Sequence, residues 1–536
     1  MDPRTIIGKS LYLTSMAAVQ STNLPPYARR QPPQMRATNA DEIHQRAGPV
    51  KPDTFDPPPY EVATNSPTSS VAPSSAVPSS TVTSTAAPST AAPNDITPTA
   101  SNTTIPNDAS PSIPSHSELA LSQALTEAVD KRHDQAEAAN LVEQVIDIAG
   151  DERRARKLVE AGAIPILITQ FHNLSPNGPG IDRVVLALGL LSHDLLSANS
   201  IVRTKTAALL MEISKGVRDQ SARACSAWCL GRLIRSDDIA TKFIDDNLHE
   251  MLTAWITTSQ DKAALRYSVW ALGNLARTDA LATKLVDAGA IPAVAAHLQH
   301  TATPNADPDN LGVALFGAAR LSRTVQFAKA LAAAGSTDPM VRTLRESRDP
   351  HVLNWAARAI GCHVRPNSSD VAKMMLDEGV AEALARLPSQ IPVPDGTQAL
   401  GSFAFAVERF SCAEWGSGPR KTLVKAGVVD ALLTALRAAT EAPNTTPRIY
   451  AELASAISFL GDVGGSAIRK EIRDAGGVDI LEQVAREGPP DVQKASETAI
   501  KTVTGNLLTR TTASAKATFS HDWSGGCPNY PLSHPK

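Results

Sequence analysis

The sequence predicts an all-α protein in which helical repeats stack into an α-solenoid. Three observations lead to this prediction. The chain has 536 residues, which is too many for one compact hydrophobic core. A short segment recurs along it, and its glycines from Gly289 to Gly476 are spaced 44–49 residues apart. From about Ser117, the composition shifts to Ala, Leu, Val, Arg and Glu, with apolar residues at helical spacing.

The recurring segment marks the beginning of each unit. It is present in two nearly identical copies and in four weaker ones: KLVEAGAIPILI (157–168), KLVDAGAIPAVA (284–295), ALAAAGSTDPMV (330–341), MMLDEGVAEALA (374–385), TLVKAGVVDALL (422–433) and EIRDAGGVDILE (471–482). A degenerate copy at 242–253 has Asn247 in the glycine position. Asn is the residue next best able to adopt a left-handed conformation, so the same turn is expected there.

Each unit is expected to contain three helices. The first ends at Ala288 and Gly289, where glycine stops the helix. Ile291 and Pro292 open the second, because a proline in the first turn loses no helical hydrogen bond. A longer third helix follows a polar loop, and its small residues allow close packing. Third helices are predicted at 182–193, 221–235, 264–277, 310–323, 352–362, 399–411 and 448–461.

This pattern resembles the armadillo repeat family. The signatures EAGAIP (160–165) and WALGNLA (270–276) carry the resemblance, which covers about residues 151–506, or roughly eight units. The resemblance implies a right-handed superhelix whose third helices line a concave groove. We therefore expect a helical N-terminal cap at 117–150 and an armadillo solenoid at 151–508.

The two ends of the chain have a different composition. Residues 64–115 are almost all Ser, Thr, Pro, Ala and Asn, which bury too little apolar surface to offset their conformational entropy. Residues 1–116 are therefore predicted to be a disordered arm. Helical periodicity is lost again near the C-terminus, so residues 509–536 are predicted to be a flexible tail.

The arm contains two short motifs that fit ligands of WW domains. Pro57, Pro58 and Tyr60 belong to a Pro-Pro-x-Tyr motif, and Leu24, Pro25 and Tyr27 are similar to its Leu-Pro-x-Tyr variant: "DPPPYEV" (56–62) and "LPPY" (24–27). A polyproline II segment is already extended, so it loses little entropy on docking. The partner implied is a WW-containing protein such as a HECT-type ubiquitin ligase. Such short motifs also arise by chance in proline-rich sequence.

One third helix carries Trp270 and Asn274, four residues apart and thus on one helix face. In the importin-α-like branch of the family, such a pair binds extended peptides: the amide bonds the peptide backbone and the indole faces hold Lys or Arg stems. The alternative is structural, with Asn274 cross-linking neighbouring repeats and Trp270 packing. The chain has one clear pair of this kind, where an importin groove needs a ladder of them.

The neighbouring units have arginine in the position of the asparagine. The resulting candidate groove residues are Trp228 with Arg232, Trp270 with Asn274, Phe316 with Arg320, Phe405 with Arg409 and, at a spacing of three, Trp355 with Arg358. A row of arginines predicts a groove that prefers acidic partners, as in the β-catenin-like branch. The alternative is that these arginines pair with acids of the chain itself, for example Glu408 or Asp279.

The motifs that would indicate an enzyme are absent from the sequence. It contains no Walker loop, no dinucleotide-binding glycine motif after a strand, no His-Glu-x-x-His and no Gly-x-Ser-x-Gly. We predict no catalytic residues, no metal site and no cofactor. Lys and Arg (51) nearly balance Asp and Glu (54), which gives no reason to expect nucleic acid as a partner.

Localisation is predicted from cysteine usage and from the absence of membrane signals. The five cysteines do not form a disulfide framework, which favours a reducing compartment. The sequence contains no run of about 18 apolar residues, so we expect no membrane-spanning helix. The N-terminal apolar run is short and broken, unlike a secretory signal. We therefore expect the protein in the cytoplasm, the nucleus or both.

Three functions agree with these observations. The first is a non-enzymatic scaffold or adaptor that binds proteins through the concave groove and recruits WW domains through the arm. The second is a regulator of a small GTPase, since some armadillo proteins promote nucleotide exchange by gripping the GTPase in the groove. The third is an importin-α-like transport adaptor.

Overall fold

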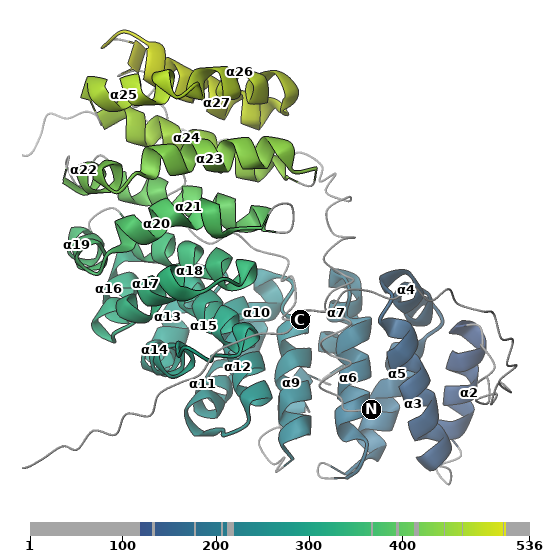
Figure 1. Cartoon of the computed structure of the whole chain (residues 1–536). Coiled ribbons are helices and arrows are strands. Elements are labelled where there is room, and N and C mark those ends of the chain that lie inside the picture. Colours follow the sequence, from purple (N-terminus) through teal and green to yellow (C-terminus); the bar gives the residue numbers. More distant parts are fainter. Residues whose placement is uncertain are drawn as a thin grey trace, which may run out of the picture. The chain divides into compact units, whose positions relative to one another are not determined.

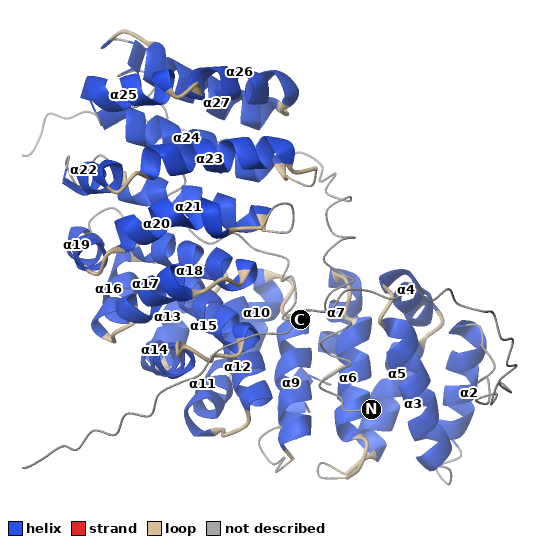
Figure 2. Ribbon diagram, in the orientation of Figure 1, coloured by secondary structure: helices blue, strands red, loops and turns tan. Residues whose placement is uncertain are grey.

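A computed structural model describes most of the chain after residue 117. The described residues are 118–130, 135–175, 178–204, 207–208, 210–211, 219–365, 368–392, 396–411, 418–443, 445–463, 465–507 and 509–510. They form helices joined by short turns, with no strand among them (Figure 2). The predicted arm with both WW-type motifs, and the tail from residue 511, lie outside the described residues.

The all-α repeat architecture is confirmed in this part of the chain. Helices α2 (Glu118–Asp130) and α3 (Gln135–Ala149) come first, and eight successive units follow (Figure 1). The first helices of the units are α4 (Glu152–Glu160), α7 (Leu195–Arg203), α10 (Asp237–Asp245), α13 (Asp279–Asp287), α16 (Val325–Ala333), α19 (Ser369–Asp377), α22 (Gly418–Lys425) and α25 (Gly465–Asp474).

The third helices are longer than the first in every unit, and so are the second helices whose bounds are described. The second helices are α5 (Ala163–Asn173), α11 (Leu248–Thr258), α14 (Ala290–Thr301), α17 (Thr337–Glu346), α20 (Val380–Gln390), α23 (Val428–Glu441) and α26 (Gly477–Glu487). In unit 2 this place is occupied by the helical residues 207–208 and 210–211. The third helices are α6 (Ile181–Leu191), α9 (Gln220–Leu233), α12 (Lys262–Leu275), α15 (Pro308–Leu321), α18 (Pro350–His363), α21 (Thr397–Phe410), α24 (Pro447–Val463) and α27 (Pro490–Thr504).

A left-handed residue separates the first and second helices, as the repeated segment predicts. Gly289 has φ = 83°, and its N–H bonds to the Val286 carbonyl at 2.9 Å to close the turn between α13 and α14. Asn247 occupies the same place in unit 3 with φ = 64°, and it is the one non-glycine residue with positive φ in the described part of the chain. The inference that asparagine replaces glycine in this turn is confirmed.

The third helices stack on one another in chain order. Each of the first seven contacts the third helix of the next unit, and α3 contacts the first of them, α6. We call this succession, from α6 to α27, the third-helix row. Apolar side chains from α2 to α27 form one continuous buried cluster. Each unit therefore buries its apolar faces against its neighbours, which a single unit is too small to do alone.

Each of the third helices α9, α12, α15 and α18 begins with an aspartate cap, which was not among the features predicted from the sequence. The Asp261 carboxylate accepts hydrogen bonds from the backbone N–H groups of Ala263 and Ala264. The equivalent caps are Asp219, Asp307 and Asp349. Because such a cap satisfies N–H groups that lack a helical partner, it fixes where the helix begins. Helix α12 accordingly spans 262–275, two residues before the predicted 264–277.

Candidate partner-binding face

The aromatic candidates pack against glycines of the preceding third helix. The Trp270 ring lies over Gly231, where a Cβ atom would be only 2.5 Å from the indole. The other contacts of this type are Trp228 on Gly189, Phe316 on Gly273 and Phe405 on Gly361. Each ring fills the space that the missing side chain leaves, so these aromatic residues determine how closely successive third helices approach.

The residue four positions after the aromatic side chain bonds to the carbonyl of the same glycine. Asn274 Nδ2 donates to Gly231 O at 3.3 Å. Arg320 Nε donates to Gly273 O at 3.0 Å, and Arg232 Nε donates to Gly189 O at 3.4 Å. Trp270 and Asn274 therefore share one face because both contact Gly231 of the previous unit. In units 2 and 4 arginine replaces asparagine, because its Nε–H can make the same bond.

Burial differs among the candidate residues. Arg232 and Asn274 are half-buried, whereas the other eight are at most 6% exposed: Trp228, Trp270, Phe316, Arg320, Trp355, Arg358, Phe405 and Arg409. Burial and the neighbouring Arg235 lower the pKa of Arg232 to about 9. The structure thus brings the candidates together along the third-helix row, where most of them pack between units. Peptide binding by these residues stays a prediction.

Unit 5 departs from the aromatic pattern. Trp355 packs edge-to-face on Phe316 of unit 4, with ring centroids 4.9 Å apart. The guanidinium of Arg358 lies 4.4 Å from the centre of the Phe405 ring and donates to Glu452 at 3.0 Å through each of its two terminal nitrogens. Arg409 lies 4.9 Å from the same ring centre. One aromatic ring in unit 6 therefore contacts arginines from units 5 and 6.

A second set of arginines, at the ends of the third helices, also links neighbouring units. Arg235 donates to Ser192 O at 2.8 Å, and Arg365 donates to Ser322 O at 2.7 Å. Arg323 pairs with Asp279 at 2.8 Å, so the acid suggested as a partner for the groove arginines pairs with this residue instead. The sequence carries a signal for this set, because an arginine recurs two residues after each third helix of units 2–5.

The order and length of the helices decide the fold family. Units of about 42–49 residues, in which a short first helix is followed by longer ones, stack through their third helices. The fold is armadillo-like. Each unit of this armadillo-like chain supplies one helix to the third-helix row, which places the candidate residues side by side.

Comparisons with known proteins agree with this fold. No family model and no curated protein matches the chain. Among solved structures, it is similar to an engineered protein, with 21% identity and a TM-score of 0.56 over 75% of this chain and 92% of the other. Two further matches are a designed armadillo repeat protein (17% identity, TM-score 0.40) and another designed armadillo repeat protein in complex with a (KR)4 peptide (18%, 0.39). Each covers 48% of this chain and 99% of the other.

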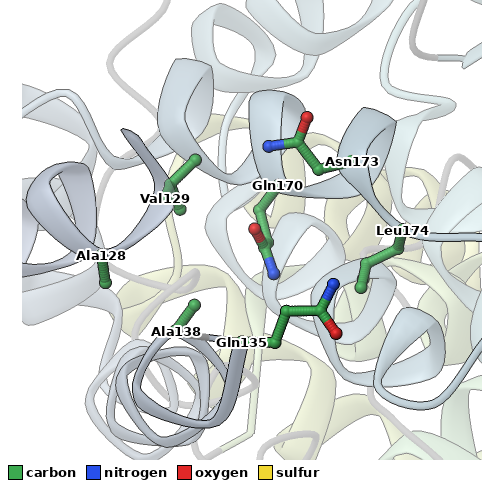
Figure 3. A pocket seen from close by; sticks show the side chains of 7 residues that line it. All are labelled: Ala128, Val129, Gln135, Ala138, Gln170, Asn173 and Leu174. Atoms are coloured by element: carbon green, nitrogen blue, oxygen red, sulfur yellow. The ribbon is translucent and has the colours of Figure 1, made fainter. Parts of the chain in front are cut away.

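A small cavity lies apart from the candidate residues, between α2, α3 and α5. It has a volume of about 170 Å³ and is lined by Ala128, Val129, Gln135, Ala138, Gln170, Asn173 and Leu174 (Figure 3). The described side chains that line it are apolar groups and amides, none of which can act as an acid, a base or a nucleophile.

The described residues also contain no cluster of three or more His, Cys, Asp or Glu side chains that could hold a metal ion. Cys225, Cys229 and Cys362 are buried free thiols, and burial raises the pKa of Cys229 to about 12. In this part of the chain no single helix is long and apolar enough to cross a membrane. Helices α13 and α14 reach that length and hydropathy together, but they are bent by 79° at their junction.

The contact between Trp270 and Gly231 leads to a stability prediction. We expect Gly231→Ala to lower the free energy of unfolding by about 1–3 kcal/mol, because the new methyl group overlaps the indole and cannot move away from helix backbone. Thermal unfolding followed by circular dichroism measures the effect. Gly418→Ala is the control, because nothing lies within 4 Å of a Cβ atom there. Equal melting temperatures for the two variants would show that the indole accommodates the methyl group.

Proposed function

We propose that the chain is a non-enzymatic scaffold, present in the cytoplasm or the nucleus, that binds an extended acidic segment of a partner protein along the third-helix row. The armadillo-like fold supports a protein-binding role, because stacked repeats present long continuous faces that suit extended partners. The observation that carries the acidic preference is the presence of arginine on three successive third helices: Arg320, Arg358 and Arg409 on α15, α18 and α21. Guanidinium groups bind carboxylates through paired hydrogen bonds.

Arg448 marks where such a partner reaches the row from solvent. Its side chain is 38% exposed at the start of α24, whereas that of Arg358 is 4% exposed. Both arginines bond to the Glu452 carboxylate, so the exposed arginine lies next to the buried one. A partner carboxylate that meets Arg448 is thus already within reach of the more deeply buried cation.

A transport adaptor for basic signals receives less support from the geometry. Holding a Lys or Arg stem requires an open indole face. Trp270 is 5% exposed, packs against Gly231 and belongs to the one clear Trp/Asn pair of the sequence, whereas the 38% exposed Arg448 gives an acidic segment access to the row. We therefore place the importin-α-like alternative after the acidic scaffold.

WW-domain recruitment is a second part of the proposal. The Pro-Pro-x-Tyr motif around Tyr60 and the related motif around Tyr27 would recruit a WW-containing protein, such as a HECT-type ubiquitin ligase, to whatever the row binds. Two motifs on one chain raise the effective concentration of the second once the first is bound.

Partner capture by the full chain, followed by mass spectrometry, tests the proposal. We expect a small set of proteins with Asp- or Glu-rich segments to bind the unaltered chain and to be lost from Arg448→Glu. The matched control is Arg345→Glu, which makes the same charge change at a similarly exposed position on the second helix α17. The same proteins recovered with Arg448→Glu would show that the row is not the binding surface.

Further capture experiments test WW-domain recruitment and the small-GTPase alternative. WW-containing proteins should be lost from Tyr60→Ala and retained by Arg448→Glu. If a small GTPase is recovered with GDP but not with a GTP analogue, or the reverse, the chain is a regulator of nucleotide exchange and not a scaffold.

A further inference from the structure

A carboxylate of unit 7 lies in an arginine site that is built by units 5 and 6. Glu452 on α24 accepts hydrogen bonds from both terminal nitrogens of Arg358 on α18, each at 3.0 Å, although the two residues are 94 positions apart. The side chains meet across α21, where Gly401 lacks a side chain. A Cβ atom at Gly401 would lie 2.6 Å from Glu452 Oε2, so the glycine leaves room for the carboxylate.

Further polar groups complete the site. Arg448, one turn before Glu452 on α24, donates to Glu452 Oε1 through Nε at 3.0 Å and through Nη2 at 2.8 Å. Ser402 on α21 accepts from Arg358 Nε at 3.0 Å and donates to the Asn354 side-chain oxygen at 2.6 Å. The bond to Ser402 orients the Arg358 guanidinium so that its two terminal nitrogens face the Glu452 carboxylate.

Three guanidinium groups lie close together at this site. Arg358 and Arg448 both bond to Glu452, and the Arg409 guanidinium lies 4.9 Å from the centre of the Phe405 ring that Arg358 also contacts. Glu452 is thus bound as a carboxylate ligand would be, by a bidentate arginine and a second cation.

We propose that these residues form a binding site for an Asp or Glu side chain of a partner segment, and that Glu452 is its internal occupant in the free chain. This inference rests on the proposed acidic partner and names the site where one of its carboxylates binds. The incoming carboxylate takes the place of the Glu452 oxygens on Arg358, and the Glu452 side chain turns toward solvent beside Arg448. Glu452 therefore lowers the apparent affinity for acidic partners by the factor with which it competes.

The test measures binding of a fluorescein-labelled (Asp-Glu)4 peptide to the full chain by fluorescence anisotropy at low ionic strength. We expect Glu452→Gln to bind this peptide at least tenfold more tightly than the unaltered chain, because a neutral amide competes weakly for two guanidiniums. The gain should be absent with an (Asn-Gln)4 peptide. It should also disappear in the double variant Arg358→Gln/Glu452→Gln, which removes the cation.

Glu452→Asp is a second variant in case the amide impairs folding. The shorter side chain keeps the charge but withdraws the carboxylate from Arg358, so an intermediate gain in affinity is expected. The proposal is overturned if neither folded variant binds the acidic peptide more tightly than the unaltered chain, or if the double variant keeps the gain. If either outcome occurs while the partner capture still recovers acidic proteins, only this site is rejected. If the partner capture recovers no acidic proteins, the proposed function is rejected.

Discussion

Arg358→Met is expected to lower the free energy of unfolding by about 3 kcal/mol. The substitution keeps an unbranched side chain against Phe405 but removes the two hydrogen bonds that Arg358 donates to the Glu452 carboxylate. The Glu452 side chain is only 15% exposed. Breaking one side of a buried ion pair is costly because the remaining charge keeps little of its solvation. Arg448 still reaches Glu452, so the expected loss lies at the lower end of the range for such pairs. Urea unfolding followed by circular dichroism measures it.

The double variant Arg358→Met/Glu452→Leu separates loss of the ion pair from loss of packing. Replacing both charges with apolar groups is often neutral or stabilising, so the second substitution should restore most of the stability. Arg448 then loses its bonds to Glu452, but its side chain is 38% exposed, so the loss of stability is small. If the double variant is as unstable as Arg358→Met, the arginine contributes through its packing on Phe405 rather than through its charge.

The repeat architecture was predictable because its signals are local. A glycine at the end of the first helix and a proline in the first turn of the second act within a few residues of themselves, as Gly289 and Pro292 do between α13 and α14. Asn247 followed from the same local reasoning. The starts of the third helices were less well predicted, because aspartates such as Asp261 were not predicted to cap them.

The candidate site was predictable as a pattern but not as a set of contacts. The spacing of four placed Trp270 and Asn274 on one face, and both do contact Gly231 of the preceding unit. Whether that face meets a partner or the next repeat depends on how closely helices stack, which no local spacing determines. The pairing of Arg358 with Glu452 depends on the stacking of three units, so no signal near either residue indicates it.

The two sets of linking side chains explain why the same residue types recur along the row. Arg320 and Arg365, on or just after one third helix, bond to backbone carbonyls at the end of the third helix before it, those of Gly273 and Ser322. Arg323 instead pairs with the Asp279 carboxylate. A carbonyl near the end of a helix lacks its usual partner four residues on, so it can accept a bond from a neighbouring unit. Arginine suits this place because it reaches across the interface and remains charged. A recurring arginine therefore indicates stacking between neighbouring units.

The stability of the protein is expected to fall as the pH drops from 6.5 toward 4, because of His363. This residue is fully buried on α18, and burial, reinforced by the nearby Arg365, lowers the pKa of its imidazole to about 4. Nδ1 donates to the Ala359 carbonyl at 2.9 Å, so Nε2 is the acceptor for the Ser336 hydroxyl at 3.1 Å. A proton on Nε2 has to displace that hydrogen bond as well as enter a dry site.

The sign follows from proton binding in the two states. An unfolded histidine has a pKa near 6.5, so between pH 6.5 and 4 the unfolded chain binds the proton and the folded chain does not. The stabilisation by neutral His363 is complete above pH 6.5 and is lost as the pH falls through this window. Between pH 7.5 and 5 this residue should account for a loss of about 2 kcal/mol.

His363→Gln isolates this contribution from the other titrating groups. Its amide can donate to Ala359 and accept from Ser336 but does not titrate, so the variant should lose less stability than the unaltered chain over the same pH range. Urea unfolding at pH 7.5 and at pH 5 gives both differences. Equal pH dependence in the two proteins would mean that the folded chain takes up the proton, through a Ser336 hydroxyl that turns to accept it.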